Sequence, residues 1–231
     1  GRSAVGRRLM VDPLSLTGAE FNASPGGRLP LMVRGACPAV PISYRLPVAS
    51  AQVKSAILLA GLNTPGITEV IEPVPTRDHS ERMLAGFGAE LTVETDAQGV
   101  RHIRLVGEAE LQPQTIEVPG DPSSAAFPIV AALITPGSEV TVTHVGMNPT
   151  RTGILEIVRD MGAGIAIESG GERAGEPIGD VHSWPSDLRG IKIGGELVPR
   201  AVDEIPIVCA LAARASGTTT IRDAEELRVK E

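Results

Sequence analysis

The sequence predicts an α/β protein, of the mixed α+β kind, that is built from repeated units with buried helices. Two observations predict this class. Apolar residues recur at helical spacing in some segments and form short strand-like runs in others. The same series of segments, which reads helix, strand, helix, strand, strand, occurs twice along the chain and begins a third time. With 231 residues, 42% of them hydrophobic, the chain can form one large domain or two small ones.

The first series starts with an Ala-rich helix that is expected over residues 50–61. A Pro-Gly turn at Pro65-Gly66 then leads into a short apolar strand. After Thr76-Arg77, a second helix is expected to end within residues 83–89 and to be followed by a strand over residues 90–93.

The second series repeats this order. An Ala-rich helix over residues 123–134 precedes a Pro-Gly turn and a strand over residues 136–142. After Thr150-Arg151 comes a helix with apolar residues on one face, which Gly162 ends as a C-cap would. Because the first helix of each series is apolar almost all round, we expect it to be buried inside its domain. A third series starts at residues 205–221.

Three segments that contain glycine are predicted as hairpin turns or surface loops, because turn-forming residues stand there between strand-like runs. These segments cover residues 24–27, 96–99 and 170–171. None of them matches the GxxxxGK[ST] or GxGxxG pattern of a phosphate-binding glycine loop, so the sequence gives no support to nucleotide-cofactor chemistry.

Composition argues against several classes of function. The formal net charge of −7 disfavours a nucleic-acid surface, and 2% aromatic residues provide few side chains on which bases can stack. No apolar run approaches the length that spans a membrane. The distant cysteines Cys37 and Cys209 fit reduced thiols, so we expect a cytoplasmic protein. The histidines share no metal-ligand spacing, so no metal site is predicted, and His144 is expected to be partly buried in a strand.

The start of the first Ala-rich helix carries polar side chains that suit an anion. Ser50 and Gln52 lie where the first backbone N–H groups of a helix lack intrahelical partners and where the helix dipole favours negative charge. A phosphorylated substrate would fit this position. The alternative is that Ser50 is only an N-cap. Lys54, one turn further, is expected to be solvated or to form a salt bridge rather than to contact a substrate.

Arg77 is a second candidate for binding an anion. It is expected where a loop meets a helix, and its guanidinium suits bidentate recognition of phosphate. It could instead pair with Asp78 or Glu81. Arg151 holds the matching place in the second series, so both arginines could be structural.

Two carboxylates precede the later Ala-rich helices. Asp121 is expected to cap the second of these helices, with Ser123 in its first turn, although this helix start could also face a cleft. Asp203 comes before Glu204 and a proline in the first helical turn, which makes it a natural N-cap of the third helix.

Several motifs occur together with the start of the first helix, and their order is informative. They include Thr76-Arg77-Asp78-His79, Asn148-Pro149-Thr150-Arg151, Asp203-Glu204-Ile205-Pro206 and Leu227-Arg228-Val229-Lys230-Glu231, with Pro119 to Phe127 between the first two. From about Arg28 to the last residue, this set resembles the 5-enolpyruvylshikimate-3-phosphate synthase family.

The resemblance implies a fold, a domain division and an activity. The fold is the two-domain enolpyruvyl transferase fold of βαβαββ units, of which the chain holds a part: residues 1–118 in the domain that binds shikimate 3-phosphate and residues 119–231 in the second domain. The activity is transfer of the enolpyruvyl group of phosphoenolpyruvate to the 5-hydroxyl of shikimate 3-phosphate, with release of phosphate. The resemblance implies neither a metal nor an organic cofactor, and it implies a monomer for the full-length enzyme.

The resemblance also assigns roles to residues. Ser50 would contact the phosphate of shikimate 3-phosphate, Ala51 would add its backbone, and Gln52 would lie against the substrate ring, with Arg77 as a further substrate-binding residue. Asp203 would hydrogen-bond the 5-hydroxyl and accept its proton. Lys230 would stabilise negative charge at that hydroxyl, and Glu231 would transfer a proton at the enolpyruvyl carbon. An arginine near the N-terminus would contact phosphoenolpyruvate, but no choice is made among Arg2, Arg7 and Arg8.

Two other functions remain open. One is enolpyruvyl transfer to UDP-N-acetylglucosamine on the same fold, although that family uses a reactive cysteine in a mobile loop and neither Cys37 nor Cys209 matches it. The other is a non-catalytic module that binds anions. Because the chain begins at Gly1 without a methionine and ends directly after a charged motif, we expect an internal fragment that is inactive by itself.

Overall fold

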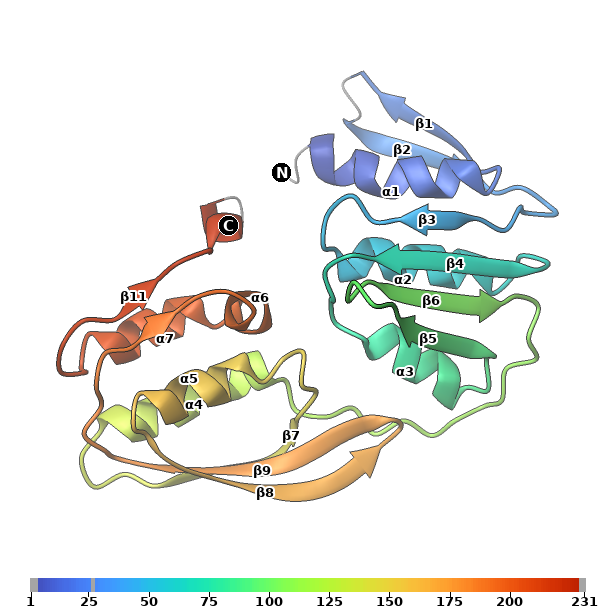
Figure 1. The fold of residues 1–231 in the computed structure, drawn as a ribbon. Helices are drawn as coiled ribbons and strands as arrows, with labels where there is room; N and C mark the ends of the chain where they lie inside the picture. Colours follow the sequence, from blue (N-terminus) through green and yellow to red (C-terminus); the bar gives the residue numbers. More distant parts are fainter. Residues whose placement is uncertain (1–3, 26–27, 229–231) are drawn as a thin grey trace. The chain divides into compact units, whose positions relative to one another are not determined.

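The predicted repeat is present in the structure, a computed structural model that describes residues 4–25 and 28–228 (Figure 1). The chain divides into a first unit, Gly1–Thr115, and a second unit, Ile116–Glu231. Each unit has a hydrophobic core of its own.

The first unit contains one whole repeat, which we call repeat A. Its elements are β3 (Ser43–Arg45), α2 (Ala51–Gly61), β4 (Ile67–Glu72), α3 (His79–Gly86), β5 (Leu91–Thr95) and β6 (Arg101–Val106). The strand order is β3-β4-β6-β5, with β3 parallel to β4 and the other pairs antiparallel. Before this repeat come α1 (Ala4–Leu16) and a hairpin of β1 (Glu20–Ser24) and β2 (Arg28–Arg34).

The two helices of repeat A pack on one face of its sheet. Every second residue of β4 is buried, and Val70 pairs with the buried Ile103 of β6. Ile57 of α2 and Leu84 of α3 complete this core. The alternation of buried and less buried residues along β4 therefore determines which face of the sheet the helices cover.

The second unit contains repeat B and the start of repeat C. Repeat B consists of α4 (Pro122–Ile134), β7 (Val140–Gly146), α5 (Gly153–Asp160), β8 (Gly164–Arg173) and β9 (Glu176–Trp184), with strand order β7-β9-β8. A parallel bridge between Gly120 and Val145 stands where repeat A pairs β3 with β4. Repeat C contributes β10 (Lys192–Ile193), α6 (Leu197–Ala201), α7 (Ile205–Ala212), β11 (Thr220–Ile221) and the 3-10 turn η1 (Glu225–Arg228).

Three sequence predictions about local structure are wrong. The Ala-rich helices are not buried all round, since Leu59 of α2 is 55% exposed and Phe127 of α4 is 62% exposed. Gly170 and Gly171 lie inside β8, where the register with β9 shifts, and the hairpin turn comes later, at residues 174–175. His144 is exposed, because it sits at an irregularity of β7 with a φ of 55°.

Within the described ranges, no helix combines the length and the apolar character that crossing a membrane requires.

Candidate functional site

The candidate site of the first unit begins at the N-terminus of α2. Ser50 is the N-cap in an extended conformation, and its Oγ accepts a hydrogen bond of 3.4 Å from the backbone N of Val53. The same hydroxyl donates to Oε1 of Gln52 at 3.3 Å. No acidic residue lies in the first turn of this helix. The partial positive charge of the helix start is therefore not offset by a carboxylate in its own first turn.

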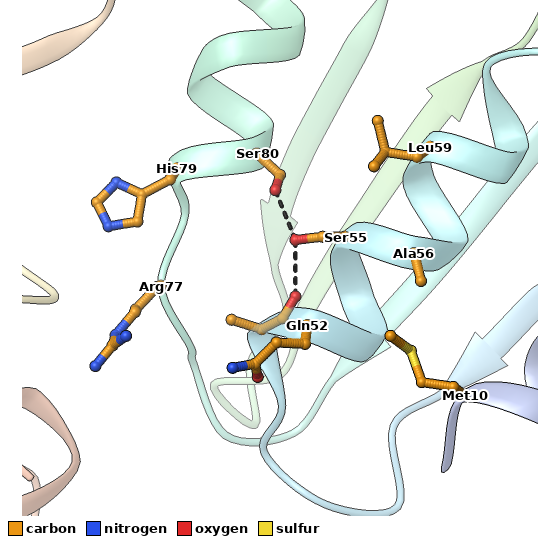
Figure 2. A pocket seen from close by; sticks show the side chains of 9 residues that line it. Met10, Gln52, Ser55, Ala56, Leu59, Arg77, His79 and Ser80 are labelled. Atoms are coloured by element: carbon orange, nitrogen blue, oxygen red, sulfur yellow. Dashed lines mark hydrogen bonds between the residues drawn. The ribbon is translucent and has the colours of Figure 1, made fainter. Parts of the chain in front are cut away.

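A pocket of about 360 Å³ lies beside this helix start (Figure 2). It is lined by Met10, Ala51, Gln52, Ser55, Ala56, Leu59, Arg77, His79 and Ser80. One cavity is thus lined by three of the residues predicted from the sequence, Ala51, Gln52 and Arg77. Ser50 directly precedes Ala51 in the chain. None of the lining residues is acidic, so the cavity suits an anion.

Sequence reasoning missed part of this lining. Gln52, Ser55, Ala56 and Leu59 follow one another at the spacing of a single helix face, and Figure 2 shows them along α2. That periodicity is a signal that could have added the last three residues to the site. His79 also lines the pocket, and Met10 comes from α1, for which no local signal exists.

Hydrogen bonds hold the segments around the pocket together. Ser55 of α2 donates to the backbone O of Ala51 at 2.8 Å, and its Oγ lies 2.6 Å from the Oγ of Ser80 at the start of α3. Thr76, which precedes Arg77, donates its hydroxyl hydrogen bond to Glu72 at the end of β4. The walls of the pocket are thereby fixed from α2, α3 and the segment between β4 and α3.

The matching place in repeat B holds a carboxylate. Asp121 caps α4, as the sequence predicts, and accepts from the backbone N of Ser124 at 2.9 Å. Arg151 donates to Asp121 at 3.0 Å and to Ser123 Oγ at 2.7 Å. Although burial alone would raise the pKa of Asp121, the bonds from Ser124 and the charge of Arg151 hold it below its ordinary value. An ionised carboxylate therefore sits between a helix start and an arginine.

Asp203 does not cap the third Ala-rich helix, contrary to the sequence prediction. The N-cap of α7 is Glu204, which makes no capping hydrogen bond through its side chain. Glu204 is buried and accepts a hydrogen bond from Ser123. Burial raises the pKa of Glu204 against the opposing effects of Ser123 and Arg151. Asp203 is only partly buried and lies just outside the helix.

Of the two states expected for Lys54, solvated or in a salt bridge, the structure shows the salt bridge: Lys54 pairs with Glu72 and Glu81, and it is fully buried. Other predicted residues lie outside the range that the structure describes. Lys230 and Glu231 lie outside the described residues, as does Arg2. Across the described segments, no group of three or more His, Cys, Asp or Glu side chains is arranged to hold a metal ion.

Comparison with solved structures identifies the class of protein that this fold defines. The enolpyruvyl transferase NikO from Streptomyces tendae superposes with a TM-score of 0.69 at 18% identity, covering 94% of this chain and 51% of that one. At this identity the likeness concerns the fold alone. The chain thus has the fold of the enolpyruvyl transferases.

The sequence narrows this class to one family. Residues 7–231 match the profile described as EPSP synthase (3-phosphoshikimate 1-carboxyvinyltransferase), and the chain belongs to this family. It is 60% identical over 226 residues to the 3-phosphoshikimate 1-carboxyvinyltransferase of Sphingopyxis alaskensis and 59% identical over 234 residues to that of Novosphingobium aromaticivorans. EPSP synthase from Acinetobacter baumannii superposes with a TM-score of 0.86 at 46% identity, covering 97% of this chain and 50% of that one.

The chain spans about half the length of the curated relatives that it matches. The alignment with the Sphingopyxis alaskensis protein covers 96% of this chain and 51% of that protein, and the alignment with the Novosphingobium aromaticivorans protein covers 100% and 53%.

Proposed function

We propose that the protein transfers the enolpyruvyl group of phosphoenolpyruvate to the 5-hydroxyl of shikimate 3-phosphate and releases phosphate. The single observation that carries this proposal is the pocket at the start of α2, which Gln52 and Arg77 line and which has no acidic residue in its lining. Its support is that the relatives with about 60% identity are named 3-phosphoshikimate 1-carboxyvinyltransferase.

Binding of the phosphorylated substrate is assigned to the first unit. The backbone N–H groups at the start of α2 and the hydroxyl of Ser50 would donate to phosphate oxygens, where the helix dipole adds attraction. Arg77, from the opposite wall, would donate a pair of hydrogen bonds to the same group. Gln52 would lie against the ring of the substrate, with Ala51 contributing its backbone N–H.

Proton transfer is assigned to the second unit. We propose that Asp203 accepts the proton of the 5-hydroxyl as that oxygen attacks the enolpyruvyl carbon, since a carboxylate can take a proton and return to its anion in each cycle. Lys230 would stabilise the developing negative charge, and Glu231 would carry the proton at the methylene carbon. Phosphate leaves when the addition product eliminates.

The two rival functions predict different ligands. Transfer to UDP-N-acetylglucosamine would require the chain to bind that nucleotide sugar, and a non-catalytic module would bind simple anions without preference for the shikimate ring. The names of the relatives favour shikimate 3-phosphate. We also propose that the full-length protein is a monomer in the cytoplasm; the exposed, unpaired thiols of Cys37 and Cys209 fit a reducing compartment.

Calorimetric titration of the chain with shikimate 3-phosphate, UDP-N-acetylglucosamine and inorganic phosphate tests the proposal. We expect binding of shikimate 3-phosphate in preference to the other two. Arg77→Ala should weaken that binding by about tenfold to a hundredfold, because a charge-assisted hydrogen bond contributes about 1.5–3 kcal/mol. Arg151→Ala is the matched control, since this arginine already pairs with Asp121. The affinity of this variant for shikimate 3-phosphate should stay near that of the wild type.

Binding of UDP-N-acetylglucosamine alone would overturn the choice of substrate. Equal affinity for shikimate 3-phosphate and inorganic phosphate would favour the non-catalytic module. An Arg77→Ala variant that binds as tightly as the wild type would remove this pocket from the proposal.

A further inference from the structure

Next along the chain to the pocket residues Ser55 and Ser80 are two members of a group of charges with little exposure, which we call the Lys54 cluster: Lys54, Glu72, Glu81 and Arg101. Lys54 and Glu72 have fully buried side chains, and that of Glu81 is 5% exposed. Lys54 Nζ lies 3.1 Å from Glu72 Oε1 and 2.7 Å from Glu81 Oε1. Arg101 Nη1 lies 3.4 Å from Glu72 Oε2, and Arg101 Nη2 lies 4.0 Å from Glu81 Oε1. The formal charges of the cluster cancel.

Repeat B has apolar residues in place of two members of this cluster, Lys54 and Glu81. The Pro-Gly turn after each Ala-rich helix aligns Lys54 with Ala125, and the Thr-Arg pair before α3 and α5 aligns Glu81 with Leu155. Both counterparts are buried and belong to the apolar core of the second unit. Burying charges costs desolvation energy, and well-packed apolar residues often stabilise a core as much or more. The charges of repeat A therefore point to a role besides stability.

The cluster connects three of the segments that line the pocket, namely α2, α3 and the segment between β4 and α3. Lys54 precedes Ser55 on α2, and Glu81 follows Ser80 on α3, while these two serines are hydrogen-bonded to each other. On the other side, Glu72 accepts the hydrogen bond of Thr76, the residue next to Arg77. One ammonium group thus holds α2, α3 and the end of β4 through two carboxylates.

We propose that Lys54 is a positioning residue, which fixes Arg77 and the start of α3 relative to the start of α2 through Glu72 and Glu81. Lys54 itself contacts no ligand, because its side chain is fully buried. This proposal rests on the proposed function only for the identity of the bound anion. The claim that Lys54 fixes residues 73–86 in place does not depend on that function.

The test replaces the charges by the residues of repeat B in the double variant Lys54→Ala/Glu81→Leu, which keeps Glu72 paired with Arg101. A second variant, Thr76→Val, cuts only the link from the cluster to Arg77 and leaves the buried charges in place. Ile57→Val is the matched control, because it loosens the packing of the same helix and leaves every charge unchanged. Thermal unfolding of each variant reports its overall stability.

The first readout needs no ligand. Hydrogen exchange of the backbone amides over residues 73–86 should become about tenfold faster in the double variant, while residues 153–160 of the second unit keep their rates. The Ile57→Val control should not change the exchange of residues 73–86 selectively. Unchanged exchange in the double variant would overturn the proposal. If this variant does not fold, the same comparison is made with Thr76→Val, for which faster exchange at the start of α3 is expected.

The second readout separates positioning from general stability. The double variant should bind shikimate 3-phosphate about tenfold more weakly, because a displacement of the order of 1 Å is enough to disrupt an oriented contact. Its affinity for shikimate, which lacks the phosphate, should change less than twofold. An equal loss for both ligands would show a merely structural role and overturn the proposal. Absence of binding in the wild type would instead refute the proposed function, while the exchange measurement still decides the role of Lys54.

Discussion

At the scale of single residues, repeat A and repeat B differ at the N-cap of their first helix. Asp121 places a carboxylate between the start of α4 and Arg151. Ser50 stands at the corresponding place in repeat A, beside the pocket that Arg77 lines. The protein carboxylate of repeat B thus stands where we propose that the phosphate of the substrate binds in repeat A.

Ser50→Asp tests this correspondence. Asp caps a helix as well as Ser does, so stability should be kept. The added carboxylate should repel the phosphate and weaken shikimate 3-phosphate binding by about a hundredfold, or about 3 kcal/mol. Calorimetric titration measures the change. Ser50→Asn, a neutral cap, is the control and should bind more than ten times as tightly as Ser50→Asp; similar affinities of the two variants would contradict the prediction.

Glu204 provides a prediction of pH dependence. Because burial raises its pKa, the folded state favours the protonated side chain, and this contribution to stability is present at low pH and lost as the pH rises through the raised pKa. Glu204→Gln cannot ionise and still offers an oxygen to Ser123. The variant should therefore unfold at a higher temperature than the wild type at pH 8.

The difference should disappear near pH 4, where Glu204 is protonated in the folded wild type. Thermal melts of both proteins across this range, followed by circular dichroism, measure it. A variant that is less stable than the wild type at pH 8 would show that ion pairing with Arg151 outweighs the cost of burial.

Residue roles were predictable where they depend on near neighbours. The caps Ser50 and Asp121 were predicted correctly, because an N-cap hydrogen bond spans only three residues. The cap at Asp203 was displaced by one residue to Glu204, and the burial of Lys54 was missed. In the case of Lys54, partners that lie far along the chain decide the outcome.

At the scale of elements, the residue that follows β6 lies so close to the end of α2 and the turn after it that only glycine fits. A Cβ added at Gly107 would lie 1.7 Å from the backbone O of Thr64. The backbone N of Gly107 also donates to Gly66 at 2.9 Å, so the strand cannot easily move away.

Gly107→Ala should therefore destabilise the first unit by about 3 kcal/mol, as overpacking against a rigid backbone does. Gly86→Ala is the matched control, because an added Cβ there meets no atom within 4 Å. That variant should be neutral or should stabilise α3 by up to about 1 kcal/mol. Urea unfolding of the two variants measures the difference, and a neutral Gly107→Ala would contradict the close packing.

The order of the elements was predicted well and their ends less well. Helices α2, α4 and α5 and the strands that follow them lie where hydrophobic periodicity and Pro-Gly turns place them. The hairpin of β8 and β9 turns later than expected, because Gly170 and Gly171 are accommodated by a register shift within the strands. Cross-strand pairing, which a single segment does not specify, decides where such a strand ends.

At the scale of the whole molecule, each unit has its own core, and an extended segment joins them. Residues 108–119 form no helix or strand and are mostly exposed. The backbone N of Gln112 donates to Phe87, and Glu117 pairs with Arg173 at 3.6 Å. Such a segment opens more easily than the packed elements on either side.

Limited digestion with a protease that cuts after glutamate should therefore cleave first at Glu108, Glu110 or Glu117. The products should be two fragments that resist further cutting, since a protease needs locally unfolded chain. Mass spectrometry of the earliest products identifies the site. Digestion in the presence of urea is the control and should remove the preference. First cuts inside β4 or α5 would contradict the division into two units.

The sequence by itself determined the class of the fold, the order of helices and strands, the repeat and the family, because these follow from local periodicity, turn residues and motifs. Only the tertiary structure decided which charges are buried and which arginine lines the pocket. Arg77 and Arg151 follow a threonine in each repeat and look alike in sequence, yet one lines a pocket and the other pairs with Asp121. Contacts between segments that are distant along the chain set that difference, and the fold alone brings those segments together.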